Sequence, residues 1–318
     1  GVSMKKISYV IPCYRSEQTI ADVVKDIRAT MRGFAEKYEY EIVLVNDCSP
    51  DDTYRVIQSL AQQYQEVKGA SLSINFGQQG ALMAGFSIAD GDMIVCLDDD
   101  GQTPPSEVGK LLDKFGQGYD VVFARYKHKK HSIFRNIGSK VNDWMAHALL
   151  GKPNDLYVSS YFIADRFVID EIIKYKNPYP YILGLILRTT RNITDVPVEH
   201  KKRVVGESGY TIGKLLGLWL NGFTAFSIVP LRAASALGAC TALLSIIYLI
   251  YIIIRKLIIS TAPIGWSSII CAVLFVGGII MCMLGMLGEY VGRMYISIND
   301  SPQFVIKERT FEEKNEGN

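Results

Sequence analysis

The chain has 318 residues, with 34 lysines and arginines and 32 aspartates and glutamates, so its formal net charge is only +2. This balance argues against a nucleic-acid role driven by bulk charge. The charges are spread unevenly, because residues 231–288 contain three basic residues and no acidic residue. The composition therefore indicates a polar domain joined to a membrane segment.

The polar part of the chain alternates predicted strands with predicted helices. Short apolar, β-rich runs predict strands at residues 7–12, 41–47, 67–74 and 93–97. Apolar residues at helical spacing, together with helix start signals, predict helices at residues 19–38, 53–64 and 80–89. This alternation predicts an α/β domain with a mostly parallel sheet, and it places ligands at the carboxyl ends of the strands.

Three consecutive aspartates follow the strand predicted at residues 93–97. In an extended segment Asp98 and Asp100 project to one side, and Gln102 projects to the same side. Adjacent carboxylates repel one another, so a fold tolerates them mainly where a cation compensates their charge. These oxygen ligands suit Mg²⁺ or Mn²⁺. A solvated acidic turn, or an aspartate that caps a helix, is the alternative interpretation, and the position after a buried strand favours the metal site.

Two long apolar runs follow the polar domain. Residues 233–254 carry no charge, and neither do residues 257–288; each run exceeds the roughly 20 residues that a helix needs to cross a bilayer. We therefore predict transmembrane helices at residues 230–256 and 264–288, preceded by an amphipathic helix at residues 212–229 that lies in the membrane interface. Buried core helices are the alternative for all three segments.

The connection between the two predicted spans is short, so both flanking polar segments are expected on one side of the membrane. The domain of residues 4–211 lacks a secretory signal and carries several basic residues close to the membrane. These features favour a cytoplasmic domain and a cytoplasmic tail at residues 289–318, although Arg255 and Lys256 in the hairpin favour the opposite orientation.

Four motifs in this order resemble a known family. They occupy residues 9–14, 45–53, 75–86 and 97–105. Together they are similar to the signatures of family-two inverting glycosyltransferases with the GT-A fold. The closer resemblance is to polyprenyl-phosphate glycosyltransferases, the group that contains dolichol-phosphate mannose synthase and the bacterial undecaprenyl-phosphate sugar transferases. The resemblance runs from about residue 5 to residue 302, and the two C-terminal spans are typical of the bacterial subgroup.

The resemblance implies a binding site for a nucleotide sugar. Asp47 would accept a hydrogen bond from the base, and Asp99 would contact the donor sugar or the ribose. The nucleoside pocket would be lined by Pro12, Tyr14 and Glu17. The family usually has Tyr-Asn-Glu at this point, whereas two residues separate Tyr14 from Glu17 in this chain.

The resemblance also implies how charge on the phosphates is neutralised. Asp98 and Asp100 would hold Mg²⁺ or Mn²⁺ against the donor diphosphate, with Gln102 as a third ligand. Arg125 and Arg135 would meet the donor diphosphate and the acceptor phosphate. The two arginines and the two aspartates would thus be the catalytic residues.

The acceptor phosphate would be held close to the membrane by Arg135, Arg203, Ser208 and Tyr210. Gly209 stands where many relatives have a lysine, so Arg203 or a neighbouring lysine would supply that charge. Residues 159–162 also depart from the Ser-Gly-Phe-Arg sequence that is usual in the family.

The resemblance therefore implies inverting transfer of a sugar, expected from a UDP-sugar, to undecaprenyl phosphate at the cytoplasmic face of the bacterial inner membrane. The product would be a lipid-linked monosaccharide for modification of cell-envelope glycans, and relatives often form homotetramers. Two alternatives stay open. One is a catalytically inactive, membrane-tethered protein that binds nucleotide sugars or acts as a scaffold. The other is a polysaccharide synthase, a class that typically carries a Gln-x-x-Arg-Trp motif and more spans.

Overall fold

The computed structural model describes residues 4–126, 153, 155–199, 266–298 and 302–312, together with scattered positions between 236 and 258. The chain forms two compact units, one of Gly1–Ile212 with Ser301–Asn318 and one of Gly213–Asp300. Several predicted features lie outside the described residues: the interface helix at residues 212–229, Arg135, Arg203, Ser208 and Tyr210.

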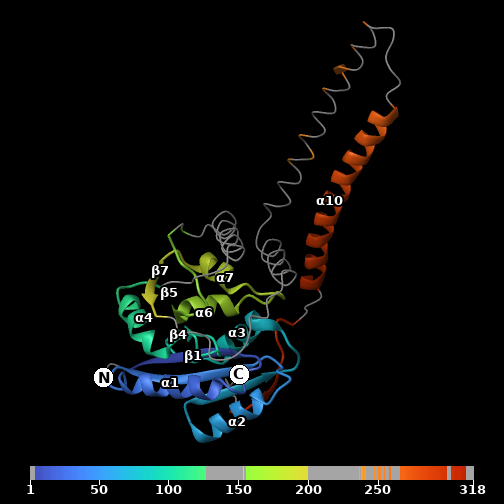
Figure 1. Ribbon diagram of the computed structural model, residues 1–318. Helices are drawn as coiled ribbons and strands as arrows, with labels where there is room; N and C mark the ends of the chain where they lie inside the picture. Colours follow the sequence, from blue (N-terminus) through green and yellow to red (C-terminus); the bar gives the residue numbers. More distant parts are fainter. Residues whose placement is uncertain are drawn as a thin grey trace. The chain divides into compact units, whose positions relative to one another are not determined.

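A mixed sheet of eight strands forms the centre of the first unit, in the order β7-β5-β6-β4-β1-β2-β3-β8 (Figure 1). The strands are β1 (Lys5–Cys13), β2 (Tyr38–Asn46), β3 (Val67–Leu72), β4 (Met93–Cys96), β5 (Val121–Tyr126), β6 (Phe162–Asp165), β7 (Ile193–Val198) and β8 (Ile306–Arg309). Four of the seven strand pairs are parallel, and β6 and β8 make the antiparallel ones. The predicted α/β class is confirmed.

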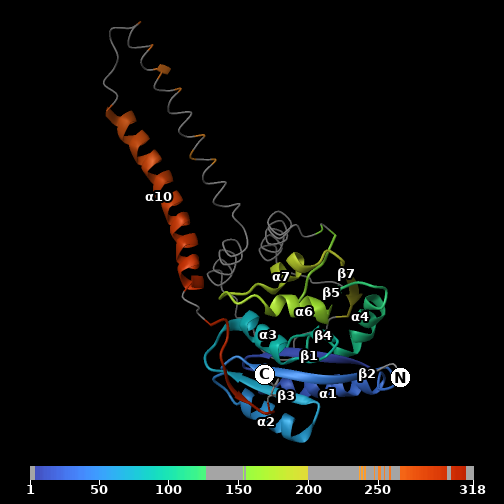
Figure 2. The same cartoon turned by 180° about the vertical axis from the view of Figure 1, so that it is seen from behind.

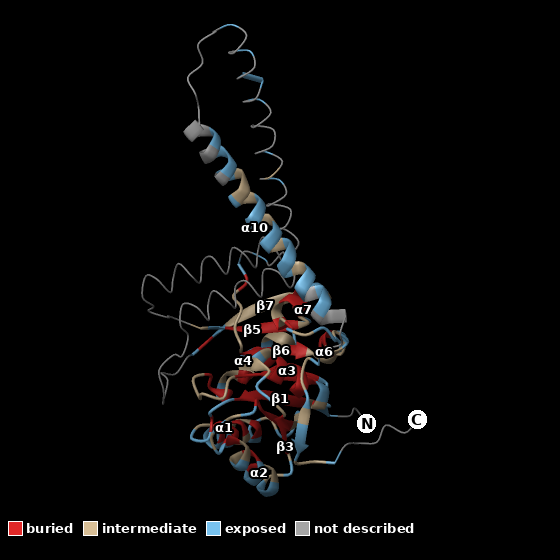
Figure 3. Cartoon of the chain, turned by 90° about the vertical axis from the view of Figure 1, so that its right-hand side faces the viewer, coloured by how far each residue is buried: buried red, intermediate tan, exposed pale blue. Residues whose placement is uncertain are grey.

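Helices cover both faces of this sheet. They are α1 (Ile20–Arg32), α2 (Thr53–Gln63), α3 (Gly77–Ile88), α4 (Val108–Phe115), α6 (Arg166–Ile173) and α7 (Ile182–Thr189), with a 3₁₀ turn η1 (Pro105–Glu107) before α4. Seen from the front and from behind, α1 and α2 lie on one face and α3 and α6 on the other (Figures 1 and 2). The buried residues concentrate on the strands between these layers (Figure 3).

Successive residues of β1 pack against helices on opposite faces of the sheet, because side chains alternate along a strand. Tyr9 and Ile11 belong to the apolar cluster that includes Val24 of α1. The intervening Val10 lies against α3, where a Cβ atom on Gly85 would stand 2.3 Å from Val10 Cγ1. Gly85 therefore lets α3 approach the sheet closely, which matters because α3 begins at the candidate site described below.

We expect Gly85→Ala to destabilise the domain, because the new methyl group would overlap Val10 Cγ1 and lie 3.3 Å from Val45 Cγ2, both on buried strands. Overpacking of this kind costs about 1–3 kcal/mol, which a lower thermal midpoint would report. Gly109→Ala in α4 is the control, since its Cβ would meet only the tip of the Phe34 ring, at 3.2 Å, and alanine favours the helix. Equal midpoints for the two variants would contradict the close approach of α3.

The helix predicted at residues 19–38 is wrong at its end. Helix α1 stops at Arg32, where the Gly33 amide donates to Thr30 O at 3.1 Å in a tightened last turn, and β2 already begins at Tyr38. The apolar residues that predicted the helix stop at Met31, so nothing buries a continuation. The helix predicted at residues 80–89 instead starts earlier, at Gly77.

Helix α10 (Trp266–Ile298) belongs to the second unit and has 33 residues. Within the described part of the chain it is the one helix that is long and apolar enough to cross a membrane, over Phe275–Gly292. It continues past the predicted end of the second span at Gly288 and includes the charged residues Glu289 and Arg293. The first predicted span, residues 230–256, is described only at scattered positions.

After α10 the chain returns to the sheet, which the sequence did not predict. Strand β8 pairs antiparallel with β3, and the Ser73 amide donates to Val305 O at 2.9 Å. At the other end of β8, the Thr310 amide donates to Gly69 O at 2.9 Å, and the Gly69 amide donates to Thr310 Oγ1 at 2.8 Å. The segment after α10 is thus an integral edge of the sheet.

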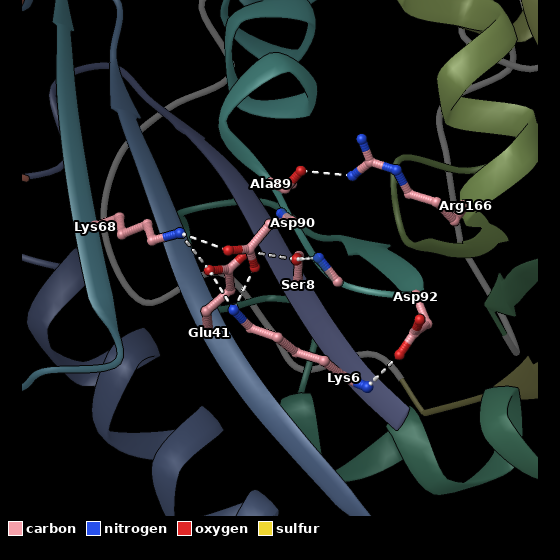
Figure 4. A network of polar contacts seen from close by, with 9 residues as sticks. Lys6, Ser8, Glu41, Lys68, Ala89, Asp90, Asp92 and Arg166 are labelled. Carbon is pink, nitrogen blue, oxygen red and sulfur yellow. Dashed lines mark hydrogen bonds and ion pairs between the residues drawn. The ribbon is translucent and has the colours of Figure 1, made fainter. Parts of the chain in front are cut away.

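A network of ion pairs ties the amino-terminal halves of β1, β2 and β3 together (Figure 4). Glu41 is only 2% exposed; its carboxylate accepts from Ser8 Oγ at 2.6 Å and from the Asp90 amide at 2.9 Å. Glu41 Oε2 also lies 3.0 Å from Lys6 Nζ and 2.7 Å from Lys68 Nζ. Burial alone would lower the pKa of Lys6, but its hydrogen bonds to Asp90 and Glu41 raise it. Lys6 therefore stays charged within the network.

Candidate active site

The carboxyl ends of β1, β2 and β4 meet at one edge of the sheet. Cys13 at the end of β1 pairs with Asn46 at the end of β2, and Val10 pairs with Cys96 at the end of β4. The loops that follow these strands are therefore neighbours, at the edge where ligands bind in open α/β sheets. These loops contain the acidic turn and the predicted nucleoside pocket.

In the acidic turn, Asp99 faces the loop after β1. Its Oδ2 accepts from the Tyr14 amide at 3.0 Å and from Ser16 Oγ. Burial raises the pKa of the Asp99 carboxyl, and the hydrogen bonds from Ser16 and Tyr14 partly offset that rise. Asp99 thus anchors the loop that carries Tyr14, and its predicted contact with the sugar or ribose stays a prediction.

Asp98 has a different set of partners from Asp99. Its Oδ1 accepts from Gln78 Nε2 of α3 at 3.1 Å, and its Oδ2 accepts from Ser160 Oγ in the segment before β6. Both carboxylate oxygens are therefore oriented by neutral donors. Asp99 and Asp100 lie in a turn and not in the extended segment assumed from the sequence, and Asp98 and Asp99 have different hydrogen-bond partners.

Asp100 begins a tight turn, in which its Oδ1 accepts from the Gln102 amide at 3.0 Å. Gly101 between them has a φ of 70°, a left-handed conformation that favours glycine. The Thr103 hydroxyl that follows is buried without a hydrogen-bond partner among the described residues.

The donor set of this turn fits a hard divalent cation. Asp98, Asp100 and Gln102 offer two carboxylates and an amide oxygen, which are the ligand types that Mg²⁺ and Mn²⁺ accept. No group of three or more His, Cys, Asp or Glu side chains within the described ranges is placed to share one ion. A cation here would consequently need further ligands, such as water or the phosphates of a substrate.

Asp47, at the end of β2, is buried and faces the start of α3. Its Oδ1 accepts from the Phe76 amide at 2.7 Å, and Asn75 Nδ2 donates to its backbone carbonyl at 3.2 Å. Burial raises the pKa of Asp47, while the amides of Phe76 and Gly77 lower it. This arrangement fixes the loop after β2 against the first turn of α3.

The loop after β1 packs against the loop after β2. Arg15 adopts a left-handed φ of 58°, and the next amide, of Ser16, donates to Thr53 Oγ1 at 2.8 Å. The Glu17 carboxylate accepts from the amide of Asp52 at 3.0 Å. These two backbone hydrogen bonds thus hold the loop that carries Tyr14 and Glu17 against the loop after β2.

The other residues predicted for the nucleoside pocket differ in accessibility. Tyr14 is 45% exposed, so its ring can stack on a planar ligand. Pro12 is buried within β1. The pocket role of Pro12, Tyr14, Glu17 and Asp47 stays a prediction.

Arg125, on β5, is held by a neighbouring strand. Its Nε lies 2.6 Å from Asp195 Oδ1, and its Nη2 donates to Asp195 Oδ2 at 2.8 Å and to the Asp155 carbonyl at 2.9 Å. This is the two-pronged geometry that arginine forms with carboxylates. A contact between Arg125 and a diphosphate, which stays a prediction, would have to compete with Asp195.

Two residues at this site were not assigned from the sequence. Gln78 and Ser160 hold the two oxygens of Asp98. Signals were present, because Gln78 lies in the motif at residues 75–86 and Ser160 lies where residues 159–162 depart from the family's usual sequence. A motif alone could not say which of its side chains reaches the acidic turn.

Comparison with known families agrees with this geometry. Residues 8–172 match glycosyl transferase family 2, and residues 229–294 match the GtrB C-terminal hairpin. The chain therefore belongs to glycosyl transferase family 2 and is a glycosyltransferase.

Curated relatives align over nearly the whole chain. An undecaprenyl-phosphate 4-deoxy-4-formamido-L-arabinose transferase from Pseudomonas fluorescens is 33% identical over 305 residues, covering 95% of this chain and 89% of the relative. The protein of that name from Klebsiella pneumoniae is 31% identical and covers 96% and 93%. The uncharacterized glycosyltransferase YkcC of Bacillus subtilis is 32% identical and covers 94% and 93%. The predicted resemblance to polyprenyl-phosphate glycosyltransferases is confirmed.

Solved structures share the fold at low identity. Glucosyl-3-phosphoglycerate synthase from Mycobacterium tuberculosis, crystallised with Mn²⁺ and UDP-glucose, superposes with a TM-score of 0.51 at 19% identity, over 66% of this chain and 74% of its own. Mannosyl-3-phosphoglycerate synthase from Rubrobacter xylanophilus gives a TM-score of 0.51 at 16% identity, over 68% and 71%. The shared fold agrees with the predicted GT-A fold.

Proposed function

We propose that this glycosyltransferase moves a sugar from a UDP-sugar to undecaprenyl phosphate, with inversion, at the cytoplasmic face of a bacterial inner membrane. The observation that supports binding of the donor is the arrangement of the acidic turn. Asp99 holds the loop that carries Tyr14, while Asp98 and Asp100 lie just beyond the carboxyl end of β4 with other partners. The names of the relatives with 31–33% identity support the acceptor half.

On the donor side, Tyr14 would stack on the base and Asp47 would accept a hydrogen bond from it. A divalent cation at Asp98, Asp100 and Gln102 would neutralise charge on the leaving diphosphate. That a glycosyltransferase with this fold is crystallised with Mn²⁺ and UDP-glucose supports these assignments. Mg²⁺ serves the same chemistry with the same oxygen ligands.

On the acceptor side, the attacking oxygen belongs to a lipid phosphate, which is already anionic at neutral pH and needs little help from a general base. Attack on the face of the sugar opposite the leaving diphosphate inverts the anomeric centre. Arg135, Arg203, Ser208 and Tyr210 remain the residues we assign to the acceptor phosphate. Arginine suits this task, because its guanidinium binds phosphate oxygens in pairs.

The connectivity of the sheet supports a hairpin in the membrane. Strand β7 precedes the apolar residues 213–300, β8 follows them, and both strands belong to one sheet. If the apolar residues enter a bilayer, they must cross it an even number of times to return to the same side. The match of residues 229–294 to a C-terminal hairpin fits two crossings.

A tetramer, proposed from the family resemblance, would be tested by light scattering of the solubilised protein.

The decisive test of the acceptor is the fate of a radiolabelled sugar. We expect label from a UDP-sugar, chosen by screening, to move into material that extracts into organic solvent when undecaprenyl phosphate and Mg²⁺ or Mn²⁺ are present. A chelator should abolish this transfer, and added metal should restore it. Label that appears only in a water-soluble product would reject the lipid acceptor, and transfer that persists in excess chelator would reject the metal.

A further inference from the structure

The segment that follows α10, residues 302–312, is called the tail below, and it lies against α3 and the loop between α6 and α7. Gln303 Nε2 donates to Asn177 O at 3.0 Å and to Tyr175 O at 3.3 Å, both in the loop between α6 and α7. The backbone carbonyl of Gln303 lies 3.1 Å from the position of a Cβ atom on Gly80, in α3. One tail residue therefore contacts both the α6–α7 loop and the start of α3.

The first turn of α3 is also held by the start of α7. Gln79 Oε1 accepts from the Ile182 amide, at the start of α7, at 2.9 Å. A Cβ atom on Gly80 would stand 2.8 Å from Phe76 Cβ, so Gly80 also packs tightly against the residue before the helix. The turn cannot shift without breaking its contact with α7 or its fit against the tail.

The same turn carries Gln78, whose Nε2 donates to Asp98 Oδ1 at 3.1 Å. With Ser160 on the other oxygen, Gln78 sets the orientation of the carboxylate that we assign to the cation. Partners of this kind tune a ligand's affinity for metal without touching the metal, and their loss typically weakens binding about 10–100-fold.

We propose that the returning tail is a structural part of the donor site. Gln303 is a positioning residue. Its side chain holds the α6–α7 loop, and that loop leads to the Ile182 amide that holds Gln79 in the first turn of α3. Gln78 in the same turn then orients Asp98 for a divalent cation. This inference rests on the proposed function, because it assumes that Asp98 binds the cation. It gives the tail a role in donor binding in addition to closing the edge of the sheet at β8.

The test is the affinity of the full-length, solubilised protein for Mn²⁺, measured by electron paramagnetic resonance without substrate. Gln78→Met keeps the length of the side chain but removes the donor, and we expect it to weaken Mn²⁺ binding about tenfold. We expect Gln303→Ala to weaken binding about threefold, since it acts through the turn. The control is Gln62→Ala, an exposed glutamine on α2, which should bind Mn²⁺ as the wild type does.

Steady-state kinetics provide a second readout. If the tail positions the donor site, Gln303→Ala should raise the KM for the nucleotide sugar more than that for the lipid acceptor, with an unchanged thermal midpoint. Wild-type Mn²⁺ affinity in Gln78→Met would overturn the role of Gln78, and wild-type affinity in Gln303→Ala would overturn the role of the tail. If Asp98→Ala itself binds Mn²⁺ like the wild type, the metal site of the proposed function fails together with this inference.

Discussion

Asp98→Ala and Asp100→Ala are each expected to lower transfer to undecaprenyl phosphate by about a thousandfold or more. The reason is electrostatic. A bound cation stabilises charge that develops on the leaving diphosphate by several kcal/mol, and about 4 kcal/mol corresponds to a factor of roughly 10³ in rate. Each variant removes one of the two carboxylates in the proposed ligand set.

The measurement is initial-rate transfer of labelled sugar at saturating metal, on protein whose thermal midpoint has been checked. Asp113→Ala provides a matched control, because Asp113 is an exposed carboxylate on α4 and its removal should leave the rate unchanged. Undiminished turnover in Asp98→Ala or in Asp100→Ala would exclude the metal site that we propose. A rate that recovers when the Mn²⁺ concentration is raised above the level that saturates the wild type would instead show that the lost carboxylate contributes affinity for the cation.

The alternating half of the fold could be predicted from the sequence because its signals are local. The run that became β1 is apolar and ends in a polar loop, and the helical spacing of α1 buries Val23, Val24 and Ile27. The same local pattern predicted that the three aspartates follow a buried strand, and they do follow β4.

The remaining features depend on contacts that are distant in sequence. The hydrogen bond from Gly69 to Thr310 joins residues 241 positions apart, and β8 is mostly charged, so it has no apolar pattern of its own. The pair between Arg125 and Asp195 likewise bridges β5 and β7. Sequence reasoning selected Arg125 for its charge type, but only the fold shows which carboxylate holds it.

Glu41→Ala is expected to be the most destabilising of the substitutions considered, at about 3 kcal/mol. Removing one partner of a buried ion pair typically costs about 3–5 kcal/mol. The lower end applies here, because Lys6 and Lys68 keep Asp90 as a partner and are each partly exposed. The Ser8 hydroxyl and the Asp90 amide would also lose their acceptor.

For a folded unit of this size, a loss of about 3 kcal/mol lowers the thermal midpoint by roughly 6–12 °C, which differential scanning fluorimetry resolves. The thermal midpoint of Glu41→Gln should lie between those of the wild type and Glu41→Ala, since an amide oxygen still accepts from Ser8 but carries no charge. Glu171→Ala is the control, because Glu171 forms an exposed pair with Lys174 on α6, and such pairs contribute about 0–1 kcal/mol. The network joins the amino-terminal halves of β1, β2 and β3 (Figure 4), whereas the acidic turn follows the carboxyl end of β4. Below its midpoint, Glu41→Ala should therefore keep the transfer rate of the wild type, and a large loss of rate in fully folded protein would contradict a purely stabilising role.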